Sequence, residues 1–370
     1  MRVGGEGRKK ILIVGEAPGR QEDEKGTQFV GVSGQRLKEA LEECGISMRR
    51  DCWTTNALIC RPPGNKIKDK NAIAYCRPNL LRSIRELNPV ITILLGGLAV
   101  RSLIVESWGK EEIGEVNRWV GWRIPCQKFN TWICPTWHPS YVIRTEEETR
   151  KPFSFFDKHI KRALEFDSHP WPDGAPDWSG KVRTIFDTRE AAQIVDQWCD
   201  LGGTFAFDYE NTCLKPEYVG GEIVCAALCR EGKETIAFPW HGDVVDACRR
   251  ILRSKKCAFI ASNMKHEDRW TRWAFGKPVR NWAWDTMIAA HALDNREKIT
   301  GLKFQAFVNF GMPSYNEHIE EFLKTTGDTK INRVKQIELS QLLKYCGLDA
   351  LLEYKLAVVQ CRQLARMNLS

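Results

Sequence analysis

Residues 167–180 divide this chain into two stretches, each with its own alternation of strand and helix patterns. The segment reads DSHPWPDGAPDWSG, is rich in Pro, Gly and Asp, and has no hydrophobic periodicity. That composition is typical of a linker. The stretch on either side is long enough to bury its own hydrophobic core. The sequence therefore predicts two domains, residues 1–166 and 181–370, joined by a linker at 167–180.

The two stretches also differ in charge. Residues 1–166 contain 28 Lys and Arg against 20 Asp and Glu, and the rest of the chain contains 27 of each. This asymmetry favours two modules with different tasks. No apolar run is long enough to span a membrane, and the apolar stretch near the N-terminus is too short for a signal peptide. We expect a cytoplasmic protein whose 14 scattered cysteines are mostly reduced and buried.

The first stretch alternates strands with helices. Residues 9–15 (KKILIVG) and 90–95 (VITILL) have the continuous apolar character of buried parallel strands. Two further strands are predicted at 54–59 and 131–135, and helices at 34–44, 70–87 and 151–166. This alternation predicts an α/β domain with a parallel sheet.

Polar and Gly-rich loops follow three of these strands. They contain Gly15-Glu16-Ala17-Pro18-Gly19, Thr55-Asn56 with the following CRPPGN, and Trp137-His138-Pro139-Ser140. Open α/β sheets bind ligands at the carboxyl ends of their strands, so the loops predict one shared site. A Gly-rich loop by itself indicates only a phosphate-binding turn.

The ordered motifs GEAPG, G-x-x-FVG-x-x-G, TN-x-x-x-CRPPGN and HPSYVIR resemble the uracil-DNA glycosylase superfamily, and family 4, the iron–sulfur type, most of all. The resemblance covers about residues 3–166. It implies a parallel-sheet α/β/α domain that flips a base out of DNA. It also implies that Phe29 stacks on uracil, that Asn56 pairs with the polar edge of uracil, and that His138 donates a hydrogen bond to the departing base. Glu16 would position or activate the attacking water.

The same resemblance implies contacts to flanking DNA. Ser140 and the turn at Pro18 and Gly19 would grip phosphates, Arg144 would also bind DNA, and Val142 with Ile143 could wedge into the base stack. Family 4 holds a 4Fe-4S cluster on four cysteines. Two of these correspond to Cys60 and Cys76, whereas the C-x-x-C pair would fall before Met1. Cys126 and Cys134 could complete a site, although their spacing is unlike the usual ligand pairs; Cys60 and Cys76 could equally be ordinary thiols.

The second stretch is predicted to start with strands at 204–208, 223–228 and 235–238, the last two joined as a hairpin, with a fourth strand at 257–261 and helices after it. In an alternating strand, Asp208 and Glu210 share one face. Tyr345 and Asp349 are four residues apart and share one face of a helix. Carboxylates grouped in this way can hold two divalent ions for attack on a phosphodiester.

This set resembles the DnaQ-like (DEDD) 3′–5′ exonucleases of the Tyr subtype, in particular the proofreading domain of family A DNA polymerases. The resemblance covers about residues 181–370 and implies an RNase H-like α/β fold. Asp208, Glu210, Asp268 and Asp349 would bind Mg²⁺ or Mn²⁺, and Tyr345 would orient the attacking water. Asp285, before Thr286, could be a helix cap or a site residue. His266 and Glu267 are expected at the surface.

Two functions follow from this pairing. One is a bifunctional repair protein that excises uracil from DNA and trims 3′ ends of single strands. The other is a proofreading subunit of a split, phage-type family A DNA polymerase, whose glycosylase-like half mainly binds DNA or senses uracil. The chain ends where the polymerase module would start in that family. Both functions predict binding to the DNA backbone, and binding that weakens at high salt.

Overall fold

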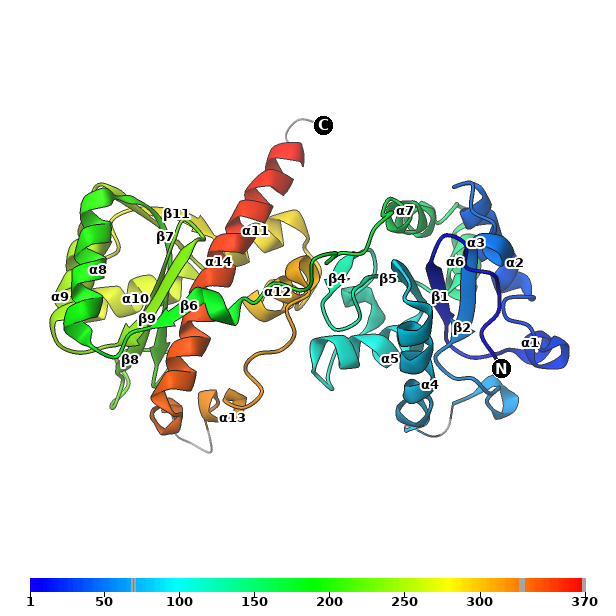
Figure 1. Ribbon diagram of the computed structural model, residues 1–370, viewed down its shortest axis with the longest axis horizontal. Coiled ribbons are helices and arrows are strands. Elements are labelled where there is room, and N and C mark those ends of the chain that lie inside the picture. The colour runs from blue at the N-terminus through cyan, green and yellow to red at the C-terminus, as the bar shows by residue number, and fades with distance from the viewer. Residues whose placement is uncertain (68, 70, 326–329, 368–370) are drawn as a thin grey trace. The chain divides into compact units, whose positions relative to one another are not determined.

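The computed structural model describes residues 1–67, 69, 71–325 and 330–367 of the chain (Figure 1). These residues form two compact units. Unit 1 contains residues 1–175 and 307–314, and unit 2 contains residues 176–306 and those from Tyr315 onward. In the part of the chain that the structure describes, none of the helices combines the length and apolar character that crossing a membrane requires.

Unit 1 is built on a five-stranded sheet with the order β2-β1-β3-β5-β4. The first four strands of this order are parallel, and β4 pairs antiparallel with β5 at the edge. Its elements are β1 (Ile11–Gly15), α1 (Arg20–Lys25), α2 (Val32–Glu42), α3 (Met48–Asp51), β2 (Cys52–Asn56), α4 (Ala72–Leu87), β3 (Ile91–Leu95), α5 (Gly97–Trp108), β4 (Ile124–Cys126), β5 (Thr131–Thr136), α6 (Pro139–Thr149) and α7 (Ser154–Ala163).

Both faces of this sheet are covered, because its strands are apolar on both sides. Ile11 and Ile13 face a core made with α2, α6 and α7, to which Leu37, Val142 and Phe156 contribute. The alternating residues of β1 are buried as well and face the other side, where α4 and α5 pack. The result is the α/β/α arrangement that the sequence predicts. The predicted helix start at Lys70 lies outside the described residues.

Unit 2 is built on a six-stranded sheet with the order β11-β10-β7-β8-β9-β6. Its elements are β6 (Val182–Thr184), α8 (Thr188–Leu201), β7 (Gly203–Asn211), β8 (Ile223–Arg230), β9 (Glu234–Pro239), α9 (Asp243–Arg253), β10 (Cys257–Ala261), α10 (Met264–Phe275), β11 (Trp282–Asp285), α11 (Thr286–Leu293), α13 (Glu320–Leu323) and α14 (Leu339–Met367). Helix α12 (Leu302–Phe310) contributes to both units, with the division after Ala306.

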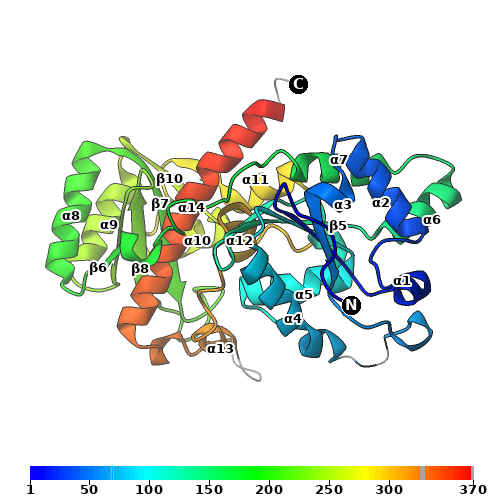
Figure 2. The ribbon, with the colours of Figure 1, turned by 45° about the vertical axis from the view of Figure 1, so that its right-hand side comes forward.

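The order of these strands defines the RNase H-like topology. Strands β7, β8 and β9 form an antiparallel meander, and β10 and β11 continue the sheet in parallel from the other side of β7. The predicted hairpin between the second and third strands is confirmed, and its turn uses positive φ angles at Glu231 and Gly232. Helices α8 and α9 cover one face of the sheet and α14 covers the other (Figures 1 and 2).

The side chains of β7 alternate between the two faces of the sheet. Phe205, Phe207 and Tyr209 join the core with α8 and α9. Asp208 and Glu210 therefore face the other side, where α14 packs against the sheet. A strand in the middle of the sheet thus carries two carboxylates toward a helix that itself carries acids.

Candidate active sites

A cavity of about 530 Å³ opens in unit 1 at the carboxyl ends of β1, β2 and β5. The cavity is lined by eight of the glycosylase-type residues predicted from the sequence: Glu16, Pro18, Gly19, Phe29, Asn56, His138, Ser140 and Arg144. Glu16 follows β1, Asn56 ends β2, and His138 precedes α6 after β5. Parallel strands bring these separate loops to one edge, so the expectation of a shared site is met by the fold.

Phe29 and Asn56 lie directly against the backbone of Gly15. A Cβ atom on Gly15 would lie 2.4 Å from Oδ1 of Asn56 and 3.0 Å from Cζ of Phe29. Phe29 itself has a φ of 56°, in the left-handed region that non-glycine residues rarely adopt. Such strain persists only where the surroundings hold it, and it is concentrated at functional sites.

Glu22 holds this strained turn in place. Its Oε1 accepts hydrogen bonds from the backbone N–H groups of Val30 and Gly31, at 3.0 and 2.8 Å. The turn that presents Phe29 is therefore closed by a carboxylate on α1. Sequence reasoning assigned no role to Glu22, because nothing local links it to a loop eight residues away.

Glu16 lies beside the N-terminus of α5. Its Oε1 accepts a hydrogen bond from the N–H of Leu98 at 3.1 Å. A Cβ on Gly96 would lie 2.5 Å from that oxygen and 3.0 Å from Cβ of His138. Glycine at position 96, which has a φ of 89°, thus lets the Glu16 and His138 side chains approach the same point of the chain.

The His138 ring is held in one orientation by the start of α6. Its Nδ1 accepts a hydrogen bond from the backbone N–H of Ser140 at 3.2 Å and lies 2.8 Å from the Ser140 hydroxyl. Burial lowers the pKa of His138 below its ordinary value, against the opposing effect of Glu16. Because Nδ1 is an acceptor, the neutral ring carries its proton on Nε2. His138 is therefore a neutral hydrogen-bond donor.

The expected wedge at Val142 and Ile143 needs correction. Val142 is fully buried in the core of unit 1 and cannot enter a base stack. Val142 faces the core from α6, whereas Tyr141 and Arg144 are exposed on the same helix. Arg144 is thus the exposed cation of this motif that also lines the cavity.

The described residues of unit 1 match two of the four cysteine positions of a four-iron cluster. Cys60 is exposed and Cys76 is half-buried. Cys126 and Cys134, which the sequence left open as further ligands, are buried on β4 and β5. We derive no chemistry through such a cluster.

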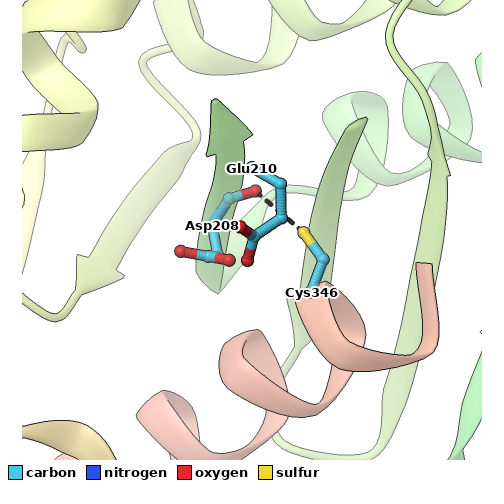
Figure 3. A group of neighbouring side chains, drawn as sticks. All are labelled: Asp208, Glu210 and Cys346. Atoms are coloured by element: carbon cyan, nitrogen blue, oxygen red, sulfur yellow. Dashed lines mark hydrogen bonds between the residues drawn. The ribbon is translucent and has the colours of Figure 1, made fainter. Parts of the chain in front are cut away.

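In unit 2, Asp208 and Glu210 lie on β7 and meet α14 (Figure 3). The Sγ of Cys346 donates to the backbone oxygen of Asp208 at 3.5 Å, which ties the helix to the strand. Tyr345 and Asp349 are buried on the same helix. The carboxylates predicted from the strand and the helix are therefore neighbours in space.

Asp349 has two polar partners that sequence reasoning missed. Lys303 on α12 forms an ion pair with one of its oxygens, and the Tyr315 hydroxyl donates to the other. The Lys303 ammonium also lies 4.5 Å from the centre of the Tyr345 ring. The tertiary packing of α12 brings Lys303 to the acids.

The fourth acidic position differs from the sequence prediction. Asp268 lies away from the other acids: it accepts hydrogen bonds from the N–H of Val279, from Nε1 of Trp282 and from Arg272. Glu267 is instead buried. Burial raises the pKa of Glu267, and the negative charge of Asp208 raises it further. His266 is half-buried and accepts from Asn211. The helical phase of α10 decides which acid points inward, and Glu267 is the buried one.

Asp285 is a structural cap. Its carboxylate accepts from the N–H groups of Met287 and Ile288 at the start of α11. It also accepts from Asn263 and Met264 at the start of α10. One side chain thus closes two helix N-termini, which settles the alternative left open by the sequence in favour of the cap.

The remaining carboxylates have more buried oxygens than the described protein groups satisfy by hydrogen bonding. Burial and then Asp349 raise the pKa of Asp208 to about 7. Burial and neighbouring acids raise the pKa values of Glu210, Glu267 and Glu353 well above the usual range of a glutamate. One oxygen each of Asp208, Glu267 and Glu353 is buried without a hydrogen-bond partner among the described residues. Oxygen ligands in such surplus fit hard divalent cations.

Comparison with known proteins identifies the family of unit 1. The uracil DNA glycosylase superfamily model matches residues 1–164. The type-4 uracil-DNA glycosylase of Pyrobaculum aerophilum is 40% identical over 147 residues, covering 38% of this chain and 73% of that protein. That of Saccharolobus solfataricus is 37% identical over 166 residues, covering 44% and 76%. The chain belongs to the uracil-DNA glycosylase superfamily through these residues.

A relative that extends over both halves is the DNA polymerase of Bacillus phage SP01. It is 24% identical over 348 residues, which cover 85% of this chain and 36% of the polymerase. Among solved structures, Escherichia coli RNase D matches 49% of this chain and 44% of its own, with 12% identity and a TM-score of 0.38. Brucella melitensis NrnC matches 51% and 84%, with 14% identity and a TM-score of 0.37. The strand order of unit 2, taken by itself, gives the second half an RNase H-like fold.

Proposed function

We propose that this chain is a bifunctional DNA-processing enzyme. Residues 1–166 would hydrolyse the N-glycosidic bond of uracil in DNA, and residues 181–370 would digest single strands from the 3′ end. The observation that carries the first activity is the single cavity lined by Glu16, Phe29, Asn56 and His138. The second rests on the buried acids shared by β7, α10 and α14.

The glycosylase step follows from the properties of these side chains. Phe29 offers a ring face for stacking, and the Asn56 amide can pair with the polar edge of uracil, which differs from that of cytosine. His138, neutral and protonated on Nε2, can donate to the uracil oxygen that gains negative charge as the bond breaks. The Glu16 carboxylate would orient a water toward the sugar carbon. Pro18, Gly19, Ser140 and Arg144 border the cavity and would contact the flanking backbone.

In the exonuclease step, Asp208, Glu210 and Asp349 would hold Mg²⁺ or Mn²⁺, with Glu267 in the position expected for Asp268. Bound divalent ions supply Lewis-acid chemistry, lowering the pKa of a water and balancing phosphate charge. Burial raises the pKa of Tyr345 well above its usual range, so its hydroxyl stays protonated. Tyr345 would therefore orient the attacking water by hydrogen bonding and would not act as a base.

Substitution of Asn56 by Asp tests the first activity. A carboxylate presents only acceptors to uracil, and we expect loss of uracil release from a uracil-containing oligonucleotide with an unchanged melting temperature. Uracil release at the wild-type rate would contradict the pocket assignment.

Asp208→Ala tests the second activity: metal-dependent degradation of single-stranded DNA should be lost, while uracil release stays at the wild-type rate.

A second candidate function is supported by the phage polymerase relative, whose similarity extends over both halves of the chain. On this account the protein is the proofreading subunit of a split family A polymerase, and the first half binds DNA or senses uracil without excising it. Uracil release separates the two proposals, because only an active glycosylase frees the base. A polymerase that co-purifies, together with bound but uncleaved uracil DNA, would favour the subunit.

A further inference from the structure

Glu353 lies one helical turn beyond the acids of the proposed exonuclease site. Tyr345, Asp349 and Glu353 follow one another at intervals of four on α14, so they form one stripe of the helix facing the sheet. Glu353 is 2% exposed. A glutamate so deeply buried needs partners for its carboxylate, since burying an unpaired charge is costly.

Within the described part of the chain, only one of the two Glu353 oxygens has a hydrogen-bond partner. Oε1 accepts a hydrogen bond from the N–H of Ser262 at 3.1 Å. Ser262 follows β10, which runs parallel to β7 on the side away from β8. Oε2 is buried and has no hydrogen-bond partner among the described residues. The free oxygen is thus held at the carboxyl end of β10, beside the strand that carries Asp208.

Two other carboxylate oxygens share this condition. Oδ2 of Asp208 and Oε2 of Glu267 are also buried and unpartnered within the described ranges. Burial raises the pKa of Glu353, and the negative charges of Asp208 and then Glu267 raise it further. The three acids come from three separate elements, β7, α10 and α14. The Lys303 ammonium is in an ion pair with Asp349.

From this convergence we propose that Glu353 is an additional ligand for a divalent cation, which it would share with Asp208 and Glu267. The inference rests on the proposed two-metal exonuclease and deepens it, since it adds a carboxylate at the second cation position. Oxygen atoms from three carboxylates suit Mg²⁺ or Mn²⁺. The same residue also holds the Ser262 N–H, so it would link β10 to the cation.

A purely structural role for Glu353 makes a different prediction. If Glu353 served only to accept the hydrogen bond from the Ser262 N–H, a neutral amide oxygen would accept that bond equally well. Glu353→Gln keeps that acceptor, keeps the size of the side chain, and removes the negative charge. The variant therefore separates metal binding from packing. Glu297→Gln, which removes an exposed acid near α12, is the matched control.

The test is a Mn²⁺ titration of the full chain without DNA, in which electron paramagnetic resonance reports free Mn²⁺. We expect two ions per wild-type chain and per Glu297→Gln chain. Glu353→Gln should bind its second ion at least about tenfold more weakly, with a metal-free melting temperature at or above that of the wild type. A Glu353→Gln titration that matches the wild type would overturn the proposal.

Asp208→Ala makes failure of the inference distinguishable from failure of the proposed exonuclease. Asp208 is proposed to hold both cations, so its loss should reduce binding of both ions. If Asp208→Ala binds Mn²⁺ as the wild type does, the two-metal site itself is wrong. If Asp208→Ala loses Mn²⁺ and Glu353→Gln does not, only the role of Glu353 is wrong.

Discussion

Gly15 shows how one residue sets the shape of the uracil cavity. It ends β1, and its missing side chain leaves room for both Asn56 and the Phe29 ring. Its φ lies outside the left-handed region, so the requirement is one of space and not of backbone conformation. The missing side chain of Gly15 therefore leaves the space occupied by Asn56, which is proposed to pair with the base, and Phe29, which is proposed to stack on it.

Gly15→Ala should consequently impair uracil release more than it impairs folding. The added methyl group meets Asn56 and Phe29 at distances that force both to shift. We expect roughly a hundredfold slower release, as for a misplaced binding group, and a destabilisation of about 1–3 kcal/mol. Gly97→Ala is the control, because the nearest atom to its Cβ is 3.9 Å away. Equal uracil release by Gly15→Ala and Gly97→Ala would contradict the packing argument.

The protonation of His138 predicts a pH dependence. Burial lowers the pKa of the ring below 6.5. The proposed donor is the neutral ring, so single-turnover uracil release should be constant from pH 8 to about pH 6.5 and should fall only at lower pH. The unfolded chain binds the His138 proton more readily than the folded chain. Stability from this residue is therefore lost as pH falls through 6.5.

A comparison of the wild type with His138→Gln measures the second effect. The free energy of unfolding of the wild type, relative to that of His138→Gln, should decrease as the pH falls from 7.5 to 5.5. A midpoint for loss of uracil release above pH 6.5, or a stability difference that does not change with pH, would show that the ring is not buried in its neutral form.

At the scale of elements, α14 determines whether the exonuclease site is assembled. The helix packs across the sheet of unit 2 and carries Tyr345, Asp349 and Glu353. It approaches β6 and β9 closely at Gly347, where a Cβ would lie 2.3 Å from Cγ1 of Val182 and 3.4 Å from Cβ of Ala237. Close packing at this glycine therefore sets how near the helical acids come to β7.

Gly347→Ala should separate the helix from the sheet. In an open helix this substitution stabilises by about 1 kcal/mol, but here the methyl group has no room, and we expect a destabilisation of about 1–3 kcal/mol. Metal-dependent digestion should slow while uracil release is unchanged. Gly301→Ala, with no atom within 4 Å of its Cβ, is the control in urea denaturation. A stabilised Gly347→Ala protein would refute the close contact.

The elements that the sequence predicts well are those with strong local patterns. The apolar strand β3, the alternating strand β7 and the β8–β9 hairpin follow from periodicity and turn residues. The short strands β4 and β6 span three residues each and exist through pairing with distant strands, so no local pattern reveals them.

The sites follow the same rule. Motifs predicted Asn56, His138 and Asp208, whereas the contacts of Glu22, Lys303 and Glu353 join separate segments of the chain. The error at Asp268 arose at the start of α10, where the cap Asn263 has a left-handed φ of 69°. An unusual helix start shifts which residue faces inward, and sequence spacing does not report it.

At the scale of the whole molecule, the two halves have different electrostatic character. The excess of 28 basic over 20 acidic residues in 1–166 suits a domain that grips a DNA backbone while a base is flipped. Residues 167–370 are balanced at 27 of each, and part of their acidity is the buried cluster at β7 and α14. Bound cations would offset this charge locally. The account therefore assigns one metal-independent and one metal-dependent reaction to one chain.

The most direct test is a paired assay on a single-stranded oligonucleotide that contains one uracil, with Mg²⁺ and with EDTA. The account predicts uracil release in both samples and shortening from the 3′ end only with Mg²⁺. Asn56→Asp should remove the first signal alone and Asp208→Ala the second alone. Retention of both signals in both variants, or digestion that continues in EDTA, would contradict two separate active sites on this chain.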